Sequence, residues 1–145
     1  MKYFTEPNGK FAIKIPVEWQ YKNGIHNMGH VSPFGFQLYE KPVGAFQISC
    51  YPTGDRKFDP SIRIQKGNTA NLNFVEGKMA DDEFTCDLWL CRVEDHFFLA
   101  KYIFDPKKDD PKLVEIERKK SIDALSTLEF PPSSSRFLQC SHFIT

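Results

Sequence analysis

Apolar and polar residues alternate near the start of the chain and predict a β-strand over residues 10–15. This period-two pattern is typical of a strand with one buried face. Pro16 follows and cannot donate a backbone hydrogen bond, so it ends the strand or places it at a sheet edge. We expect Trp19 to fold back over the end of this strand. The apolar set is Phe11, Ile13 and Ile15, and the set between them is Lys10, Ala12 and Lys14.

The same alternation predicts a β-hairpin over residues 34–51. Two alternating runs flank Lys41-Pro42-Val43-Gly44, which is typical of a turn. Because the residues between the apolar positions are mostly polar, we expect one face of this hairpin to be in water. The apolar positions are Phe34, Phe36, Leu38, Phe46, Ile48 and Cys50.

A second hairpin is predicted over residues 84–104, where two apolar runs flank Glu94-Asp95. With a two-residue loop, Val93 faces His96 and Trp89 faces Ala100. Both faces are apolar, so the hairpin either lies mid-sheet with cover on both sides or meets a partner with one face. One face carries Phe84, Cys86, Leu88, Leu90, Phe97, Leu99 and Ile103, and the other carries Trp89, Cys91, Val93, Phe98, Tyr102 and Phe104.

Residues 53–80 give the weakest pattern. Asp59-Pro60 resembles a helix N-cap followed by proline at the first helical position, whereas Ile62 and Ile64 alternate as in a strand. We expect a short helix or turn here and then a strand near residues 72–75.

A helix is predicted from Pro111 to about Ser126, with Asp110 as its N-cap. Its apolar side is interrupted by Arg118, so we expect its first half to pack less tightly. Residues 1–131 are expected to form a single domain, and residues 132–145 a flexible tail. The side of the helix expected to face the core carries Val114, Ser121, Ile122 and Leu125.

Two of these segments resemble a known family. The run from Gly9 to Pro16, followed by Trp19, resembles the opening strand of PsbP-like domains. Residues 121–125, followed by Phe130, are similar to the closing helix of that superfamily, which includes the Ran-release-factor proteins and many uncharacterised bacterial domains.

The resemblance implies an α+β fold, with a central antiparallel sheet and packed helices that include a C-terminal one. It also implies that the chain binds another protein and does not catalyse a reaction. The plant branch carries a transit peptide that this chain lacks, so nothing about photosystems follows.

Composition narrows the class of partner. The chain has 145 residues, which suits one domain, and its 19 basic and 19 acidic residues cancel. Nucleic-acid binding needs a cationic surface, so a neutral chain argues against it. No apolar run is long enough to span a membrane. If Met1 is the native start, the absence of a signal peptide predicts a cytoplasmic protein, which we expect to be a monomer or weak homodimer.

The search for chemistry predicts no catalytic set, metal or cofactor. The four cysteines form no C-x-x-C pair, and Cys86 and Cys91 fall on opposite faces of one strand, so buried free thiols are expected. His26 and His30 have the spacing of zinc ligands on a helix, but their segment has poor helix propensity and lacks the glutamate of a metalloprotease.

Two functional hypotheses follow. The first is a non-catalytic protein-interaction or chaperone-like adaptor domain, with Trp89, Phe98 and Tyr102 as the partner-binding residues. The alternative is a small metal-dependent or hydrolytic enzyme that uses His26, His30 and nearby carboxylates. That enzyme would need those groups to converge in one cleft.

Overall fold

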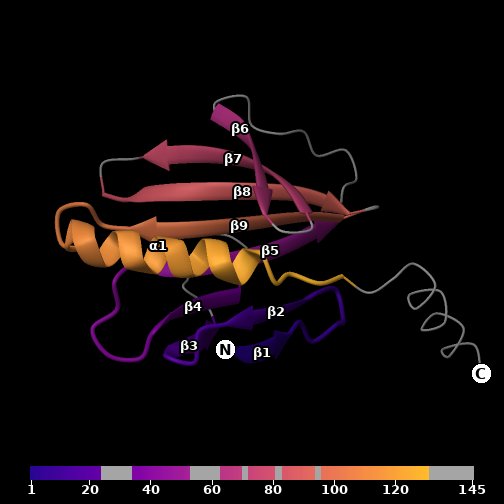
Figure 1. Cartoon of the computed structure of the whole chain (residues 1–145), viewed down its shortest axis with the longest axis horizontal. Coiled ribbons are helices and arrows are strands. Elements are labelled where there is room, and N and C mark those ends of the chain that lie inside the picture. The colour runs from indigo at the N-terminus through magenta and orange to yellow at the C-terminus, as the bar shows by residue number, and fades with distance from the viewer. Residues whose placement is uncertain (24–33, 53–62, 70–71, 81–82, 94–95, 131–145) are drawn as a thin grey trace, which may run out of the picture.

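The computed structural model describes residues 1–23, 34–52, 63–69, 72–80, 83–93 and 96–130. Within these residues the main layer is a seven-stranded sheet in the order β3-β4-β5-β9-β8-β7-β6, and each neighbouring pair is antiparallel (Figure 1). The strands are β3 (Trp19–Asn23), β4 (Phe34–Leu38), β5 (Ala45–Pro52), β6 (Arg63–Thr69), β7 (Leu72–Ala80), β8 (Thr85–Val93) and β9 (His96–Phe104).

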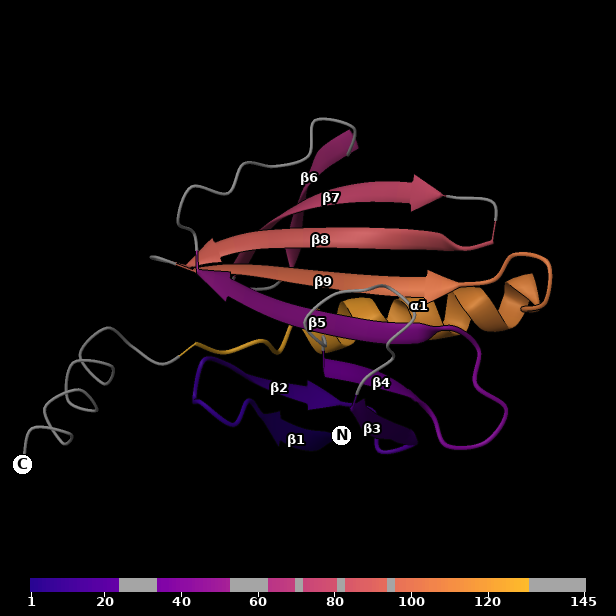
Figure 2. The ribbon, with the colours of Figure 1, turned by 180° about the vertical axis from the view of Figure 1, so that it is seen from behind.

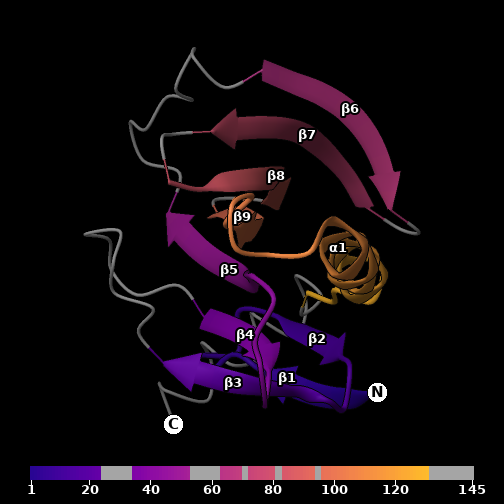
Figure 3. The same ribbon diagram turned by 90° about the vertical axis from the view of Figure 1, so that its left-hand side faces the viewer.

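One helix, α1 (Pro111–Leu125), covers one face of this sheet. A separate two-stranded sheet, β1 (Lys2–Thr5) paired with β2 (Ala12–Ile15), lies beside the β3–β4 end, and β2 contacts α1. Seen along the helix, the large sheet curves around α1 from β6 to β3 (Figure 3). The result is the expected α+β fold, in which an antiparallel sheet carries a C-terminal helix.

The core lies between the large sheet, α1 and β2. The apolar side of the first predicted strand is buried here, since Phe11, Ile13 and Ile15 have almost no exposed surface. Trp19 is also buried and stacks on Phe46, with 5.6 Å between the ring centroids. The predicted strand and its end before Pro16 are confirmed, although β2 begins at Ala12 and not at residue 10. β3 begins at Trp19 itself and was not predicted as a strand.

The segment after α1 returns to β2. The backbones of Ala12 and Glu129 exchange two hydrogen bonds, of 2.9 and 2.8 Å. Phe130 then packs on Phe98, with 4.4 Å between the ring centroids. The closing segment therefore holds β2 and α1 together over the sheet.

The hairpin over residues 84–104 has the predicted register. Val93 faces His96 and Trp89 faces Ala100. β8 and β9 lie in the interior of the sheet, as their two apolar faces required. Cys91 lies in the core under α1, whereas Cys86, on the opposite side of the strand, does not. Both thiols are buried, as expected.

The predicted wet face of the hairpin over residues 34–51 is wrong. Gln47 and Ser49 point away from the core, yet they are only 2% and 7% exposed. The physical reason at Gln47 is that residues of other elements lie around it: Phe84, Asp105 and Asp109 line the same cavity as Gln47. The antiparallel hairpin itself and its turn are confirmed.

The expected helix or turn before residue 72 is wrong where the structure describes it. β6 begins at Arg63 and pairs with β7 along its length. The predicted strand near residues 72–75 is real but extends to Ala80. Asp59 and Pro60 lie outside the described residues.

The helix begins and ends close to the predicted bounds. The Asp110 side chain caps it by accepting a 2.8 Å hydrogen bond from the Lys112 amide, and Pro111 is the first helical residue. In the part of the chain that the structure describes, no helix is both long and apolar enough to cross a membrane. The expected tail, residues 132–145, lies outside the described residues.

Candidate functional site

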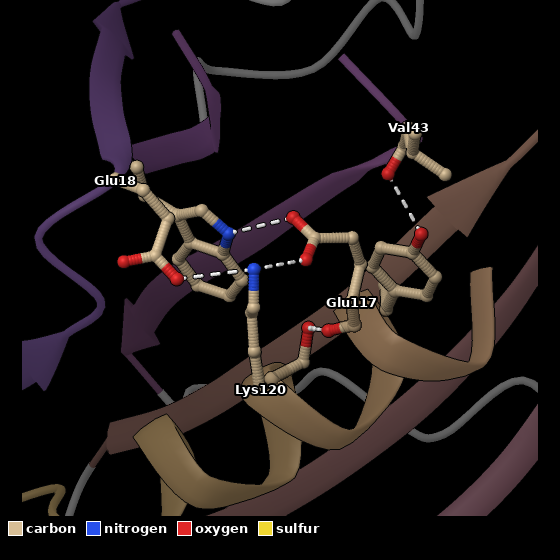
Figure 4. Close-up of polar contacts among 7 residues, drawn as sticks. Glu18, Val43, Glu117 and Lys120 are labelled. Carbon is tan, nitrogen blue, oxygen red and sulfur yellow. Dashed lines mark hydrogen bonds and ion pairs between the residues drawn. The ribbon is translucent and has the colours of Figure 1, made fainter. Parts of the chain in front are cut away.

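A buried carboxylate joins α1 to the turn before β3. Glu117 is 3% exposed, and its Oε1 accepts a 3.0 Å hydrogen bond from Trp19 Nε1. Its Oε2 lies 2.6 Å from the ammonium of Lys120, which also lies 3.0 Å from Glu18 Oε1. Figure 4 shows Lys120 between the two carboxylates. These four residues form the Glu117 network.

The network follows from the spacing along α1. Glu117 falls on the same side of the helix as Val114 and Ser121, so it is carried into the core with them. A charge in such a place is costly unless it is paired and hydrogen-bonded. Lys120 is one turn further along the same helix and is close enough to neutralise it.

The contacts within the network shift the pKa values of Lys120 and Glu18. Burial alone would lower the pKa of Lys120, but hydrogen bonds to Glu117 and Glu18 raise it. The pKa of Glu18 is lowered by a backbone hydrogen bond and then by Lys120. A lysine that is held protonated is a poor nucleophile, because the neutral amine is the reactive form. The network is suited to fixing the helix on the sheet.

Tyr102 and Cys91 are held protonated as well. The Tyr102 hydroxyl donates a 2.7 Å hydrogen bond to the Val43 carbonyl (Figure 4). Burial, reinforced by the negative charges of Glu117, Asp109 and Asp87, raises the pKa of Tyr102 far above its usual range. Burial also raises the pKa of the Cys91 thiol. Both shifts work against a catalytic base or a thiolate nucleophile.

A second ion pair ties α1 to β8. Arg118 Nε lies 2.7 Å from Asp87 Oδ2, and Asp87 is 5% exposed. Arg118, which interrupts the apolar side of the helix, therefore has a specific partner on the sheet. This contact neutralises an enclosed carboxylate whose isolation would be costly.

A cavity of about 250 Å³ opens on the sheet face opposite α1. Its lining comes from the β4–β5 turn, the end of β9 and the loop that leads to α1. Figure 2 shows these three segments at the same end of the sheet. Gln47 lines it, and Gln47 Nε2 is a buried donor without a partner in the described structure. The lining also includes Gln37, Phe84, Ile103, Asp105 and Asp109.

The residues predicted to bind a partner lie in the core. Trp89, Phe98 and Tyr102 are 1%, 3% and 1% exposed and belong to the cluster beneath α1. Two arrangements were expected for the face of the β8–β9 hairpin that carries these residues, namely burial within the protein or contact with a partner. The structure shows burial within the protein. Partner binding through these three residues stays a prediction, and it would require the elements that cover them to move, since Phe98 packs on Phe11 and Phe130.

The histidines of the enzyme alternative, His26 and His30, lie outside the described residues, as does Cys140. Within the described residues there is no group of three or more potential metal ligands. Sequence reasoning missed Glu117 and Gln47. The helical spacing places Glu117 on the side expected to be buried, so the sequence could have indicated it. Gln47 alternates with apolar residues in the same way as a solvent-exposed strand residue, so nothing in the sequence indicated its burial.

Comparisons with known proteins show the class of fold. No protein-family model matches the chain, and no curated protein matches it. Among solved structures, it is similar to a chain from Bacteroides thetaiotaomicron, with a TM-score of 0.67 and 16% identity. That match covers 92% of this chain and 49% of the other, so this chain spans about half of its length.

The chain is also similar to the solution structure of cyanobacterial PsbP, CyanoP, from Synechocystis sp. PCC 6803. The TM-score is 0.58 at 7% identity, over 90% of this chain and 92% of CyanoP. The antiparallel sheet and the C-terminal helix are consistent with this likeness. The protein has a PsbP-like fold, as the resemblance of its first strand and last helix predicted.

Proposed function

We propose that this protein is a non-catalytic domain that binds another protein through an exposed apolar surface beside the Glu117 network. Four side chains make up this surface, and we name it the α1 apolar surface. They are Val17, Tyr39, Leu113 and Ile116, with exposed fractions of 64%, 73%, 46% and 52%.

The single observation that carries the proposal is the Glu18–Lys120 ion pair, which joins the side of α1 that carries the exposed Leu113 and Ile116 to the turn that carries the exposed Val17. Val17 precedes Glu18, and the Tyr39 amide donates a 3.3 Å hydrogen bond to the Glu18 carbonyl. These contacts place the backbones of Val17 and Tyr39 next to that of Glu18. Exposed apolar groups rimmed by charges are typical of surfaces that bind proteins.

The helix supplies the other half of the surface. Ile116 lies one turn before Lys120, and Leu113 lies one turn before Ile116. Residues three or four apart share one side of a helix. The ion pair therefore links the side of α1 that carries Leu113 and Ile116 to Glu18, which follows Val17 in the chain.

The ionisable groups of the core support binding over catalysis. Lys120, Tyr102 and Cys91 each have a raised pKa, which keeps the protonated form at neutral pH. The PsbP-like fold is compatible with a non-catalytic domain. The enzyme alternative rests on His26 and His30 and gains no support from the described residues.

The test is affinity capture from the native host with the wild-type protein and a Leu113→Gln/Ile116→Gln double variant. Both substitutions replace exposed residues by a good helix former, so we expect a melting temperature close to that of the wild type. The captured protein should be lost with the double variant, and its direct binding to the purified domain should weaken at least about tenfold, since such anchors carry about 1.4 kcal/mol or more.

A Met79→Gln variant is the matched control, because Met79 is an exposed apolar residue on β7, away from α1. It should retain the partner. If the double variant captures and binds the partner as the wild type does, the α1 apolar surface is not the contact. Light scattering on the same samples shows whether the partner is a second copy of this chain.

A further inference from the structure

The cavity on the sheet face opposite α1 combines an apolar wall with polar groups at two places. Phe84 and Ile103 supply apolar surface, and Gln47 lies among them on β5. Asp105 and Asp109, from the loop between β9 and α1, line it as well. Ligand sites are commonly concave and apolar with a few placed polar groups.

Gln47 is the feature that points to a ligand. The side chain is 2% exposed, and its Nε2 donates to no acceptor in the described part of the structure. A buried amide donor is normally paired, because leaving it unpaired forfeits the hydrogen bonds it would make in water. A hydrogen-bond acceptor on a bound molecule would satisfy it.

The acidic side of the cavity sets the charge of that molecule. Asp109 Oδ2 accepts a 2.9 Å hydrogen bond from the Asp105 amide, and Asp105 Oδ1 accepts one of 2.9 Å from the Lys107 amide. These bonds fold the loop and hold two carboxylates at the same cavity. Two neighbouring negative charges attract a cation and repel an anion.

We propose that this cavity binds a small cationic amphiphile, a molecule with an apolar body, a hydrogen-bonding group at one end and an ammonium at the other. Its hydrogen-bonding group meets Gln47, its body packs on Phe84 and Ile103, and its ammonium lies at Asp105 and Asp109. The site goes beyond the proposed protein-binding function and shares no residue with the α1 apolar surface.

Tyramine is the probe, because its hydroxyl, ring and ammonium match the three parts of the cavity. We expect saturable binding with a Kd of roughly 1 mM or tighter for a ligand of this size. Titration of isotope-labelled protein, followed by NMR, should move the Gln47 side-chain amide signal. Phenethylamine lacks the hydroxyl and 4-ethylphenol lacks the ammonium, so each should bind at least about fivefold more weakly than tyramine, as expected for one lost polar contact.

Two variants assign the polar contacts. Gln47→Leu removes the unpaired donor and keeps an enclosed apolar side chain, so it should fold and bind tyramine about tenfold more weakly. Asp109→Asn keeps a side-chain oxygen for the Asp105 amide but removes the charge. It should weaken tyramine binding and leave 4-ethylphenol binding unchanged. Asp123→Asn, an exposed acid on α1, is the control and should bind as the wild type does.

Several outcomes would overturn the proposal. One is the absence of saturable tyramine binding to the wild type, which would mean that a water molecule, and not a ligand, accepts the hydrogen bond of Gln47 Nε2. Equal affinity for tyramine and 4-ethylphenol would remove the role of the carboxylates. Wild-type affinity in Gln47→Leu would remove the role of the amide. None of these results bears on the protein partner, which is tested on the other face.

Discussion

At the scale of single residues, the core uses ionisable side chains to fasten elements together. Tyr102 reaches from β9 to the Val43 carbonyl in the β4–β5 turn, and Glu117 reaches from α1 to Trp19. Each contact lies in a largely enclosed place, where a polar group without a partner would be costly. Because the pKa of Tyr102 is raised by burial in the folded state, the protonation of Tyr102 contributes to the folding free energy.

The first prediction at this scale is the pH dependence of Tyr102→Phe. At pH 7 the variant should lose about 1–2 kcal/mol of unfolding free energy, because the Val43 carbonyl loses its donor. The pKa of Tyr102 is raised in the folded state, so this contribution is complete below the ordinary tyrosine value of about 10. Above it the unfolded chain loses the proton first, and the stability falls.

The difference in unfolding free energy between the wild type and Tyr102→Phe should therefore decrease by about 1.4 kcal/mol between pH 9 and pH 11. Urea denaturation at pH 7, 9 and 11 measures the gap. Tyr39→Phe is the control, since Tyr39 is 73% exposed and should show a constant difference near zero. A gap for Tyr102→Phe that does not narrow at pH 11 would contradict the raised pKa.

At the scale of elements, the β4–β5 turn depends on a glycine for two separate reasons. Gly44 has φ +64°, a conformation that favours glycine. A Cβ at this position would lie 2.5 Å from the Ile103 carbonyl oxygen and 2.8 Å from the Tyr102 hydroxyl. The turn can approach β9 this closely because there is no side chain.

Gly44→Ala should therefore destabilise the protein by about 2–5 kcal/mol, the sum of the left-handed backbone cost and an overpacking cost. Gly9→Ala is the matched variant. Gly9 also has a positive φ, of 72°, but no atom lies within 4 Å of the added Cβ. It should lose only about 1–2 kcal/mol. Equal losses in urea denaturation would show that β9 moves to accept the methyl group.

At the scale of the whole molecule, the helix and the sheet form one packed unit. Trp89 is enclosed beneath α1, and the Asp87–Arg118 ion pair joins the same two layers. The enclosed aromatic residues of β8 and β9 thus contribute to the stability of the whole fold.

Trp89→Ala should accordingly lower the unfolding free energy by about 3–5 kcal/mol. The mass in solution should stay that of the wild type, because the side chain lies inside the fold. Calorimetry measures the first quantity and light scattering the second. Met79→Ala, at an exposed position, should change neither. If Trp89→Ala keeps its stability but loses association with a partner, Trp89 binds that partner directly.

Several local elements were predictable without any knowledge of the fold. They are the strand in which Ile13 and Ile15 alternate with polar positions, the register of β8 with β9, and the Asp110 cap of α1. Each depends on residues that are close together in the chain, through side-chain period, loop length or a cap. Short-range geometry of this kind does not need the rest of the fold.

The enclosure of particular polar residues, in contrast, depends on tertiary packing. Gln47 alternates like a surface residue, and its burial follows from residues of other elements that line the same cavity. Glu117 meets Trp19 although 98 positions separate them. Such pairings depend on how distant segments pack, and a period-two or helical pattern contains no information about the neighbour across the core. The cavity arises in the same way, since β4, β5, β9 and the loop before α1 all contribute to its lining.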